Sequence, residues 1–201
     1  AKGFLGWGSG ETPGDEKLLR YLWENKHHTP FEMAGATFEV QAPVFVFREW
    51  HRHRTQSYNE MSARYVPMPN EHYTPAVARL MTGAGKNKQA AQIVGKQLTT
   101  EKGRDWLTKL AALYEISEAV YQEGLNAGVP KELARLAVTV SRYSRMRASA
   151  NLRNWLGFLA LRLPTNAQWE IRQYANAIAL ALNEGFPRTL ELFRFSTGVD
   201  A

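Results

Sequence analysis

The segment from residue 52 to residue 65 carries side chains suited to binding a phosphorylated ligand. It holds the arginines Arg52, Arg54 and Arg64, and a guanidinium donates hydrogen bonds in a planar pattern that matches phosphate and carboxylate oxygens. A lone carboxylate, Glu60, stands among these cations beside an amide. Such acceptors can orient ribose hydroxyls or the edge of a heterocycle. The segment therefore predicts a site for a nucleotide or a nucleotide-like cofactor.

A solvated basic stretch, or a nucleic-acid patch in which Tyr58 and Tyr65 alternate with the arginines, is the alternative interpretation. Phe47 and Trp50 directly upstream argue against a fully solvated segment. The net charge of +6 and the pI near 9.6 favour anionic partners of any kind, so charge does not choose between the two. A nucleic-acid-binding module would have an affinity that falls steeply with salt.

The composition indicates a globular chain without thiol chemistry. Its 201 residues are 44% hydrophobic and 22% charged, which is ordinary for one globular domain. The absence of cysteine excludes disulfides, thiolate metal sites and cysteine nucleophiles, and it fits a cytoplasmic location. No uncharged apolar stretch is long enough to predict a membrane span, so we expect no membrane partner.

Hydrophobic periodicity predicts an α+β fold in a single domain. Helices are expected over residues 15–24, 106–120, 151–161 and 167–182, and strands over residues 37–40 and 143–150. A short helix or turn is expected over residues 58–64. A further helix should begin at Pro130 and point Leu133, Leu136 and Val140 inward. Gly185 and Pro187 are expected to end the last helix.

Two glycine-containing stretches do not predict phosphate-binding loops. The glycine-rich residues 3–14 follow no predicted strand, so a linker or lid is expected there. Residues 82–89 have the wrong spacing for a P-loop and carry Asn87 where serine or threonine is required.

Residues 52–65 resemble, nearly letter for letter, the signature of the flavin-dependent thymidylate synthases (the ThyX family). The signature begins Arg-His-Arg and continues through Ser-x-Asn-Glu-x-Ser-x-Arg-Tyr. A His-x-Thr-Pro-Phe-Glu segment at residues 27–32 is also similar to the family. Residues 130–174 contain three more elements that are similar to the family: Pro-x-Glu-x-Ala-Arg, Asn-x-Arg and Leu-x-Leu-Arg. Family members usually carry an extra strand and helix upstream, so we expect that a segment before Ala1 is missing.

The resemblance implies a fold and an activity. The fold is a small, mainly antiparallel sheet flanked by long helices. The activity is reductive methylation of dUMP to dTMP, with FAD as cofactor and with NADPH and methylenetetrahydrofolate as co-substrates. The family assembles as a homotetramer whose active sites are shared between subunits. The resemblance therefore implies that this chain also forms a homotetramer with shared active sites. A flavin-based reaction needs no protein thiol, in keeping with the missing cysteine.

The resemblance also implies site residues. The FAD-binding residues would be Thr29, Arg52, His53, Arg54, Glu60, Asn151 and Arg153. The dUMP-binding residues would be Glu49, Arg52, Glu60, Ser62, Arg64, Arg135 and Arg162. The catalytic residues would be Arg162, which holds the uracil and favours its N3-ionised form, and His27, which lies near the flavin N5.

Three of these residues have other interpretations. Ser62 is a potential nucleophile, but no neighbour in its segment is an obvious base, so a phosphate-binding role is preferred. Arg135 alone would be read as an exposed helix arginine. His27 and His28 could ligate a metal. The chain has no cysteine, His-Glu-x-x-His motif or acidic cluster to complete such a site, so no metal is expected.

Three positions depart from the family pattern. Glu49 stands where a glutamine is common, and a carboxylate near a phosphate is unfavourable unless it is paired. Gly157 replaces an asparagine expected near FAD, and Asn166 replaces a histidine beside the cofactor. A family member that binds nucleotide without turnover is therefore a third interpretation.

Overall fold

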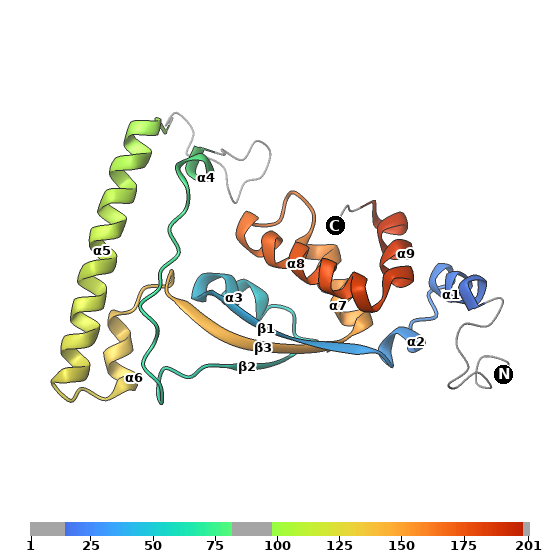
Figure 1. Ribbon diagram of the computed structural model, residues 1–201, viewed down its shortest axis with the longest axis horizontal. Coiled ribbons are helices and arrows are strands. Elements are labelled where there is room, and N and C mark those ends of the chain that lie inside the picture. Colours follow the sequence, from blue (N-terminus) through green and yellow to red (C-terminus); the bar gives the residue numbers. More distant parts are fainter. Residues whose placement is uncertain (1–14, 82–97, 199–201) are drawn as a thin grey trace. The chain divides into compact units, whose positions relative to one another are not determined.

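The computed structural model describes residues 15–81 and 98–198 (Figure 1). The chain divides into two compact units. The first comprises Ala1–Phe38, His53–Ser57 and Ser149–Ala201, and the second comprises Glu39–Arg52 and Tyr58–Ala148. The prediction of a single domain is not tested by this division. The glycine-rich residues 3–14 and the polar residues 82–89 lie outside the described residues.

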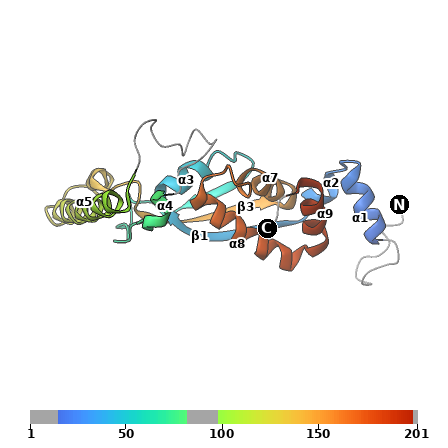
Figure 2. The same ribbon diagram turned by 90° about the horizontal axis from the view of Figure 1, so that it is seen from above.

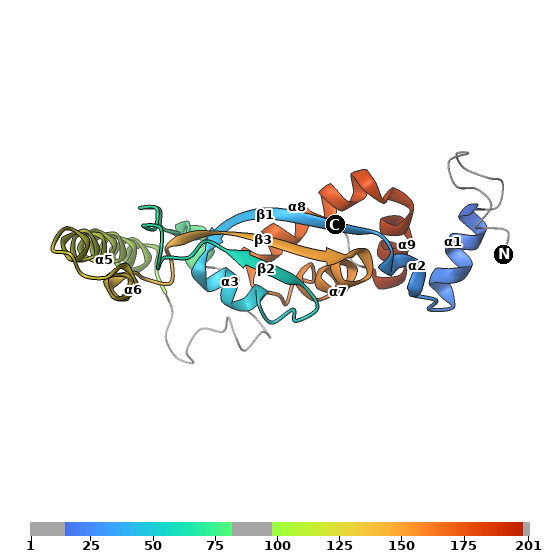
Figure 3. The same cartoon turned by 90° about the horizontal axis from the view of Figure 1, so that it is seen from below.

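Three antiparallel strands form the sheet, in the order β1 (Gly35–Pro43), β3 (Tyr143–Asn151) and β2 (Ser57–Glu60) (Figure 3). The predicted strands over residues 37–40 and 143–150 are confirmed. Side chains on a strand point alternately to opposite faces, and β3 buries Ser144, Met146 and Ala148 while the residues between them are more exposed. β3 is the central strand by its place in this order, and its alternation shows that one of its faces lies in the protein interior.

The prediction of a helix or turn over residues 58–64 is wrong, because β2 occupies Ser57–Glu60. Just beyond this strand, the backbone N–H of Met61 donates to the carbonyl oxygen of Arg145 at 2.8 Å. Pairing with β3 thus outweighs the polar composition of the segment, as expected for β-structure, whose stability depends on its context. The turn lies later, over residues 63–65.

The described residues of the second unit also form helices. They are α3 (Val44–Trp50), α4 (Val77–Met81), α5 (Thr100–Asn126), α6 (Lys131–Ala134) and the 3₁₀ turn η2 (Arg135–Ala137). The predicted long helix is confirmed. Its N-cap is Thr99, whose side chain accepts from the N–H of Lys102 at 3.3 Å. α6 lies beside α5 in both views (Figures 1 and 2).

The prediction that Leu133, Leu136 and Val140 point inward is wrong for the isolated chain. Their exposed fractions are 52%, 81% and 64%. α6 has only one turn and buries Ala134 alone. The helical spacing predicted an apolar face correctly, but nothing in the described part of this single chain covers it.

The described residues of the first unit form the helices α1 (Asp15–Glu24), α2 (Thr29–Glu32), α7 (Leu152–Arg162), α8 (Trp169–Gly185) and α9 (Pro187–Thr197). The predicted helices over residues 15–24, 151–161 and 167–182 are confirmed, with Asn151 as the N-cap of α7. α9 was not predicted. Pro187 was expected only to end α8. Proline is also tolerated in the first turn of a helix, and here Pro187 begins α9.

A fully buried arginine, Arg142, links several segments in the interior of the second unit. Arg142 pairs with Glu118 of α5 and donates at 3.0 Å to the carbonyl oxygen of Pro69 and to Oδ1 of Asn70. Its guanidinium carbon lies 5.5 Å from the centre of the Tyr121 ring. A buried charge needs such compensation, and these bonds fix the segment that follows β2. In the described ranges, no helix is both long and apolar enough for a membrane span.

Candidate functional site

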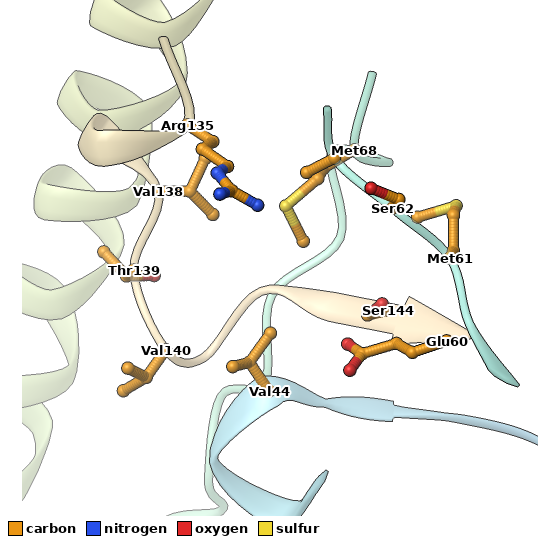
Figure 4. A pocket seen from close by; sticks show the side chains of 11 residues that line it. Val44, Glu60, Met61, Ser62, Met68, Arg135, Val138, Thr139, Val140 and Ser144 are labelled. Carbon is orange, nitrogen blue, oxygen red and sulfur yellow. The ribbon is translucent and has the colours of Figure 1, made fainter. Parts of the chain in front are cut away.

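A pocket of about 410 Å³ lies in the second unit, within the size range typical of small-ligand sites (Figure 4). β2, the segment after it, η2 and the start of β3 contribute to its wall. Three residues that the sequence analysis predicted as ligand-binding lie together here: Glu60, Ser62 and Arg135. The rest of the lining is largely apolar and consists of Val44, Met61, Ala63, Met68, Val138, Thr139, Val140 and Ser144.

The polar groups of this pocket are segregated by charge. Arg135 begins η2, and its guanidinium points into the pocket from one side. Glu60, the last residue of β2, and Ser144 of β3 lie on the opposite side (Figure 4). A cation facing a carboxylate and a hydroxyl across apolar walls suits a ligand that is anionic at one end and rich in hydroxyl groups at the other.

Arg64 is not among the residues that line the pocket, but it stabilises the segment that does. Its Nε donates to Oε2 of Glu132 on α6 at 2.9 Å, and Nζ of Lys131 donates to the carbonyl oxygen of Tyr65 at 3.0 Å. Both carboxylate and guanidinium are about half exposed, so the pair alone adds little stability. The two contacts together hold the turn that follows Ser62 against α6. The ligand-binding role of Arg64 remains a prediction.

Arg162 and His53 contact each other in the first unit. Nε of Arg162, the last residue of α7, donates to Nε2 of His53 at 2.8 Å. Burial, followed by the neighbouring Arg162 charge, lowers the pKa of His53 from 6.5 to about 4. The imidazole is therefore neutral at physiological pH and can accept this bond. An edge-on contact with the Phe158 ring, 4.8 Å between centroids, also holds the imidazole.

Two predicted cofactor residues already have structural roles in the first unit. Asn151 caps α7, since its Oδ1 accepts from the backbone N–H of Asn154 at 2.9 Å. Arg153 forms an ion pair with Glu32. Neither interaction uses every donor of the side chain, so cofactor binding at these residues remains a prediction.

The other predicted residues of the first unit lie near the ends of short helices. His27 follows α1, with its ring edge-on to that of Tyr21 at 6.0 Å, and Thr29 begins α2. Arg54 is exposed in the segment before β2. In residues 15–81 and 98–198, no group of three or more histidines and acidic residues could hold a metal ion.

Two predicted residues of the second unit lie at the end of α3. Glu49 is half-buried within the helix, and Arg52 follows it in an exposed position. The exposed guanidinia of Arg52 and Arg54 have the charge and planar geometry that the phosphates of a dinucleotide cofactor require. FAD binding at these two residues remains a prediction.

Two of the three residues that depart from the family pattern face solvent. Gly157 lies inside α7, and a Cβ placed there would meet nothing within 4 Å. Asn166 is exposed in the segment between α7 and α8. A glycine inside a helix costs roughly 0.5–1 kcal/mol relative to alanine, so Gly157 weakens α7 slightly.

The sequence analysis missed the contribution of β3 and the segment before it to the pocket. Ser144, Thr139 and Val138 line it, yet none of the three was predicted as a site residue. The only signal was the alternation along residues 143–150, which places Ser144 on the buried face with Met146. Alternation predicts burial but does not show which buried residues face a cavity.

Comparisons with known proteins agree with the predicted family. Residues 8–188 match the family described as thymidylate synthase complementing protein (Thy1). The chain is 38% identical over 179 residues to a flavin-dependent thymidylate synthase of Thermotoga neapolitana, and 40% identical over 179 residues to one of Thermosipho africanus. Each alignment covers 89% of this chain and 76% of the relative.

A solved structure is also similar. The fold superposes on the crystal structure of a UMP/dUMP methylase, PolB from Streptomyces cacaoi, bound with 5-Br UMP. The TM-score is 0.82 and the sequence identity 33%, with 92% of this chain and 85% of that chain covered. This similarity confirms the α+β fold with a small antiparallel sheet.

Proposed function

We propose, from the premise that the chain belongs to the flavin-dependent thymidylate synthase family, that it methylates dUMP to dTMP. The protein is thus a methyltransferase of that family. In our proposal, methylenetetrahydrofolate donates the carbon and NADPH is the reductant. The observation that supports the substrate best is the pocket in which Arg135 faces Glu60 across apolar walls. A nucleoside monophosphate has the matching distribution of charge, apolar ring and sugar hydroxyls.

The protein would bind the nucleotide at its two ends. Arg135 provides a guanidinium for the phosphate, and Ser62 a hydroxyl. Glu60 accepts a hydrogen bond from the sugar. Arg162, held by neutral His53, would hold the uracil and stabilise its N3-ionised form, because a guanidinium beside a developing anion forms a charge-assisted hydrogen bond.

The exposed arginines Arg52 and Arg54 would bind FAD, together with His53, Thr29 and Arg153. When bound and reduced by NADPH, FAD would supply the hydride for the reduction. His27 would lie near the flavin ring, where an imidazole can influence the redox state.

UMP is a second candidate substrate. The protein of the similar solved structure is named a UMP/dUMP methylase and was crystallised with 5-Br UMP. An acceptor such as Glu60 could serve either sugar. Comparing dUMP and UMP as methyl acceptors in one assay would decide between them.

The test is an anaerobic incubation of the purified protein with FAD, NADPH, methylenetetrahydrofolate and dUMP. We expect dTMP to form only when FAD is present, so omission of FAD is the control. Bound flavin without any methylated product would contradict the proposed activity and favour a family member that binds without turnover. Absence of both flavin binding and product, with salt-sensitive binding to DNA or RNA, would instead support a nucleic-acid-binding module.

We also propose a homotetramer with shared active sites. The exposed apolar side chains Leu133, Leu136 and Val140 on and after α6 support an assembly, because exposed apolar patches commonly mark interaction surfaces.

A further inference from the structure

Ser144 stands out among the residues of the pocket. Its side chain is 1% exposed, and its Oγ has no hydrogen-bond partner in the described structure. A buried hydroxyl without a partner costs free energy, because it has lost its bonds to water. Such a group in a pocket wall can regain a hydrogen bond from a ligand.

The neighbours of Ser144 limit what that ligand group can be. Ser144 and Glu60 lie next to each other, away from Arg135 (Figure 4). A phosphate beside the Glu60 carboxylate would be repelled and would bind better beside Arg135. A hydroxyl can donate to a carboxylate and accept from a serine in the same place. The Glu60–Ser144 side of the pocket therefore suits an alcohol group rather than an anion.

We propose that Ser144 is a substrate-binding residue whose hydroxyl bonds a sugar hydroxyl of the nucleotide beside Glu60. This inference rests on the proposed function, since it assumes a nucleoside monophosphate in the pocket. It adds a residue of β3 to those of β2 and η2. It also makes the Glu60–Ser144 pair the part of the pocket that recognises the sugar.

Another buried serine of the same unit provides a matched control. Ser117 of α5 is 6% exposed, does not line the pocket, and its Oγ donates to the carbonyl oxygen of Ala137 at 2.6 Å. Its hydroxyl is satisfied within the protein, whereas that of Ser144 is not. Replacement by alanine should therefore affect different properties at the two positions.

The experiment measures the affinity of the FAD-loaded protein for dUMP, UMP and inorganic phosphate, together with Tm, for wild type, Ser144→Ala and Ser117→Ala. We expect Ser144→Ala to bind nucleotide about fivefold to tenfold more weakly, the loss of one neutral hydrogen bond. Its affinity for phosphate should stay at the wild-type value, and its Tm should stay the same or rise, because the unpartnered hydroxyl is removed. Ser117→Ala should lower Tm and leave all three affinities unchanged.

The outcomes separate this inference from the proposed function. Weaker binding of both nucleotides by Ser144→Ala supports a contact to the 3′-hydroxyl, and weaker binding of UMP alone supports a contact to the 2′-hydroxyl. Unchanged affinity for both nucleotides, or a loss of affinity for phosphate, would overturn the role of Ser144. A wild-type protein that binds neither nucleotide would instead contradict the proposed function itself.

Discussion

At the scale of single residues, Arg162 is the side chain on which the chemistry should depend most. Replacement by alanine removes the guanidinium that would stabilise the ionised uracil. We expect Arg162→Ala to reduce dTMP formation by a factor of at least about 100, the typical effect of losing one such group. FAD should remain bound, as measured by flavin absorbance after gel filtration. Turnover near the wild-type rate would contradict the assignment.

The lowered pKa of His53 predicts how stability depends on pH. Between pH 6.5 and about 4 the unfolded chain binds a proton at this histidine and the folded chain does not. The free energy of unfolding should therefore fall as the pH is lowered through this range. In His53→Gln the fall should be smaller, measured by urea denaturation at several pH values.

Part of the fall should persist in that variant. The pKa of His72 is also lowered, by burial and then by Arg142, while Glu118 acts in the opposite direction. An identical pH dependence in wild type and His53→Gln would show that His53 is protonated equally in both states.

At the scale of elements, the start of α7 shows how one residue can have two roles. Asn151 caps the helix and is also a predicted FAD-binding residue. We expect Asn151→Ala to lower the free energy of unfolding by about 1 kcal/mol, and Asn151→Ser to restore most of it, because serine is also a good N-cap. If both variants bind FAD more weakly in a flavin titration, Asn151 has both roles. Equal stability of all three proteins would contradict the capping role.

How far the sequence predicts these elements depends on where their stability comes from. α1, α7 and β3 were predicted nearly to their ends, whereas the helix predicted over residues 106–120 stops six residues short of each end of α5. β2 was missed because its four residues are stabilised by pairing with β3, which lies more than 80 positions away. α9 was missed because Pro187 indicates the end of one helix and the start of another equally well.

The residues of the candidate site also fall into those that the sequence predicted and those that it did not. The arginine-rich segment and Arg135 stood out by residue type, and the pocket does bring Glu60, Ser62 and Arg135 together. Ser144 did not stand out, because a serine on the buried face of a strand has no distinguishing pattern. Its importance depends on a missing hydrogen-bond partner, which only three-dimensional structure can reveal.

At the scale of the whole molecule, the exposed apolar side chains predict assembly. Leu136 is 81% exposed, and we expect it to be covered in a homotetramer. Leu136→Glu should shift the protein to smaller species in sedimentation velocity and lower dTMP formation, if active sites are shared. Leu180→Glu is a matched control: Leu180 of α8 is also exposed, at 61%, but it does not belong to the apolar face formed by Leu133, Leu136 and Val140, so its replacement should leave the sedimentation coefficient unchanged. A fully active monomer would contradict both the assembly and the shared sites.

The path of the chain between the two compact units has a consequence for folding and for evolution. The boundaries of the units show that the chain passes from one to the other four times, and both long strands are divided between them. Neither unit is a continuous stretch that a gene could lose, duplicate or exchange alone. During synthesis, the β1 residues of the first unit cannot pair until β3 residues more than 100 positions later have been made. Such long-range pairing favours slow folding. A single calorimetric transition would show that the two units unfold together.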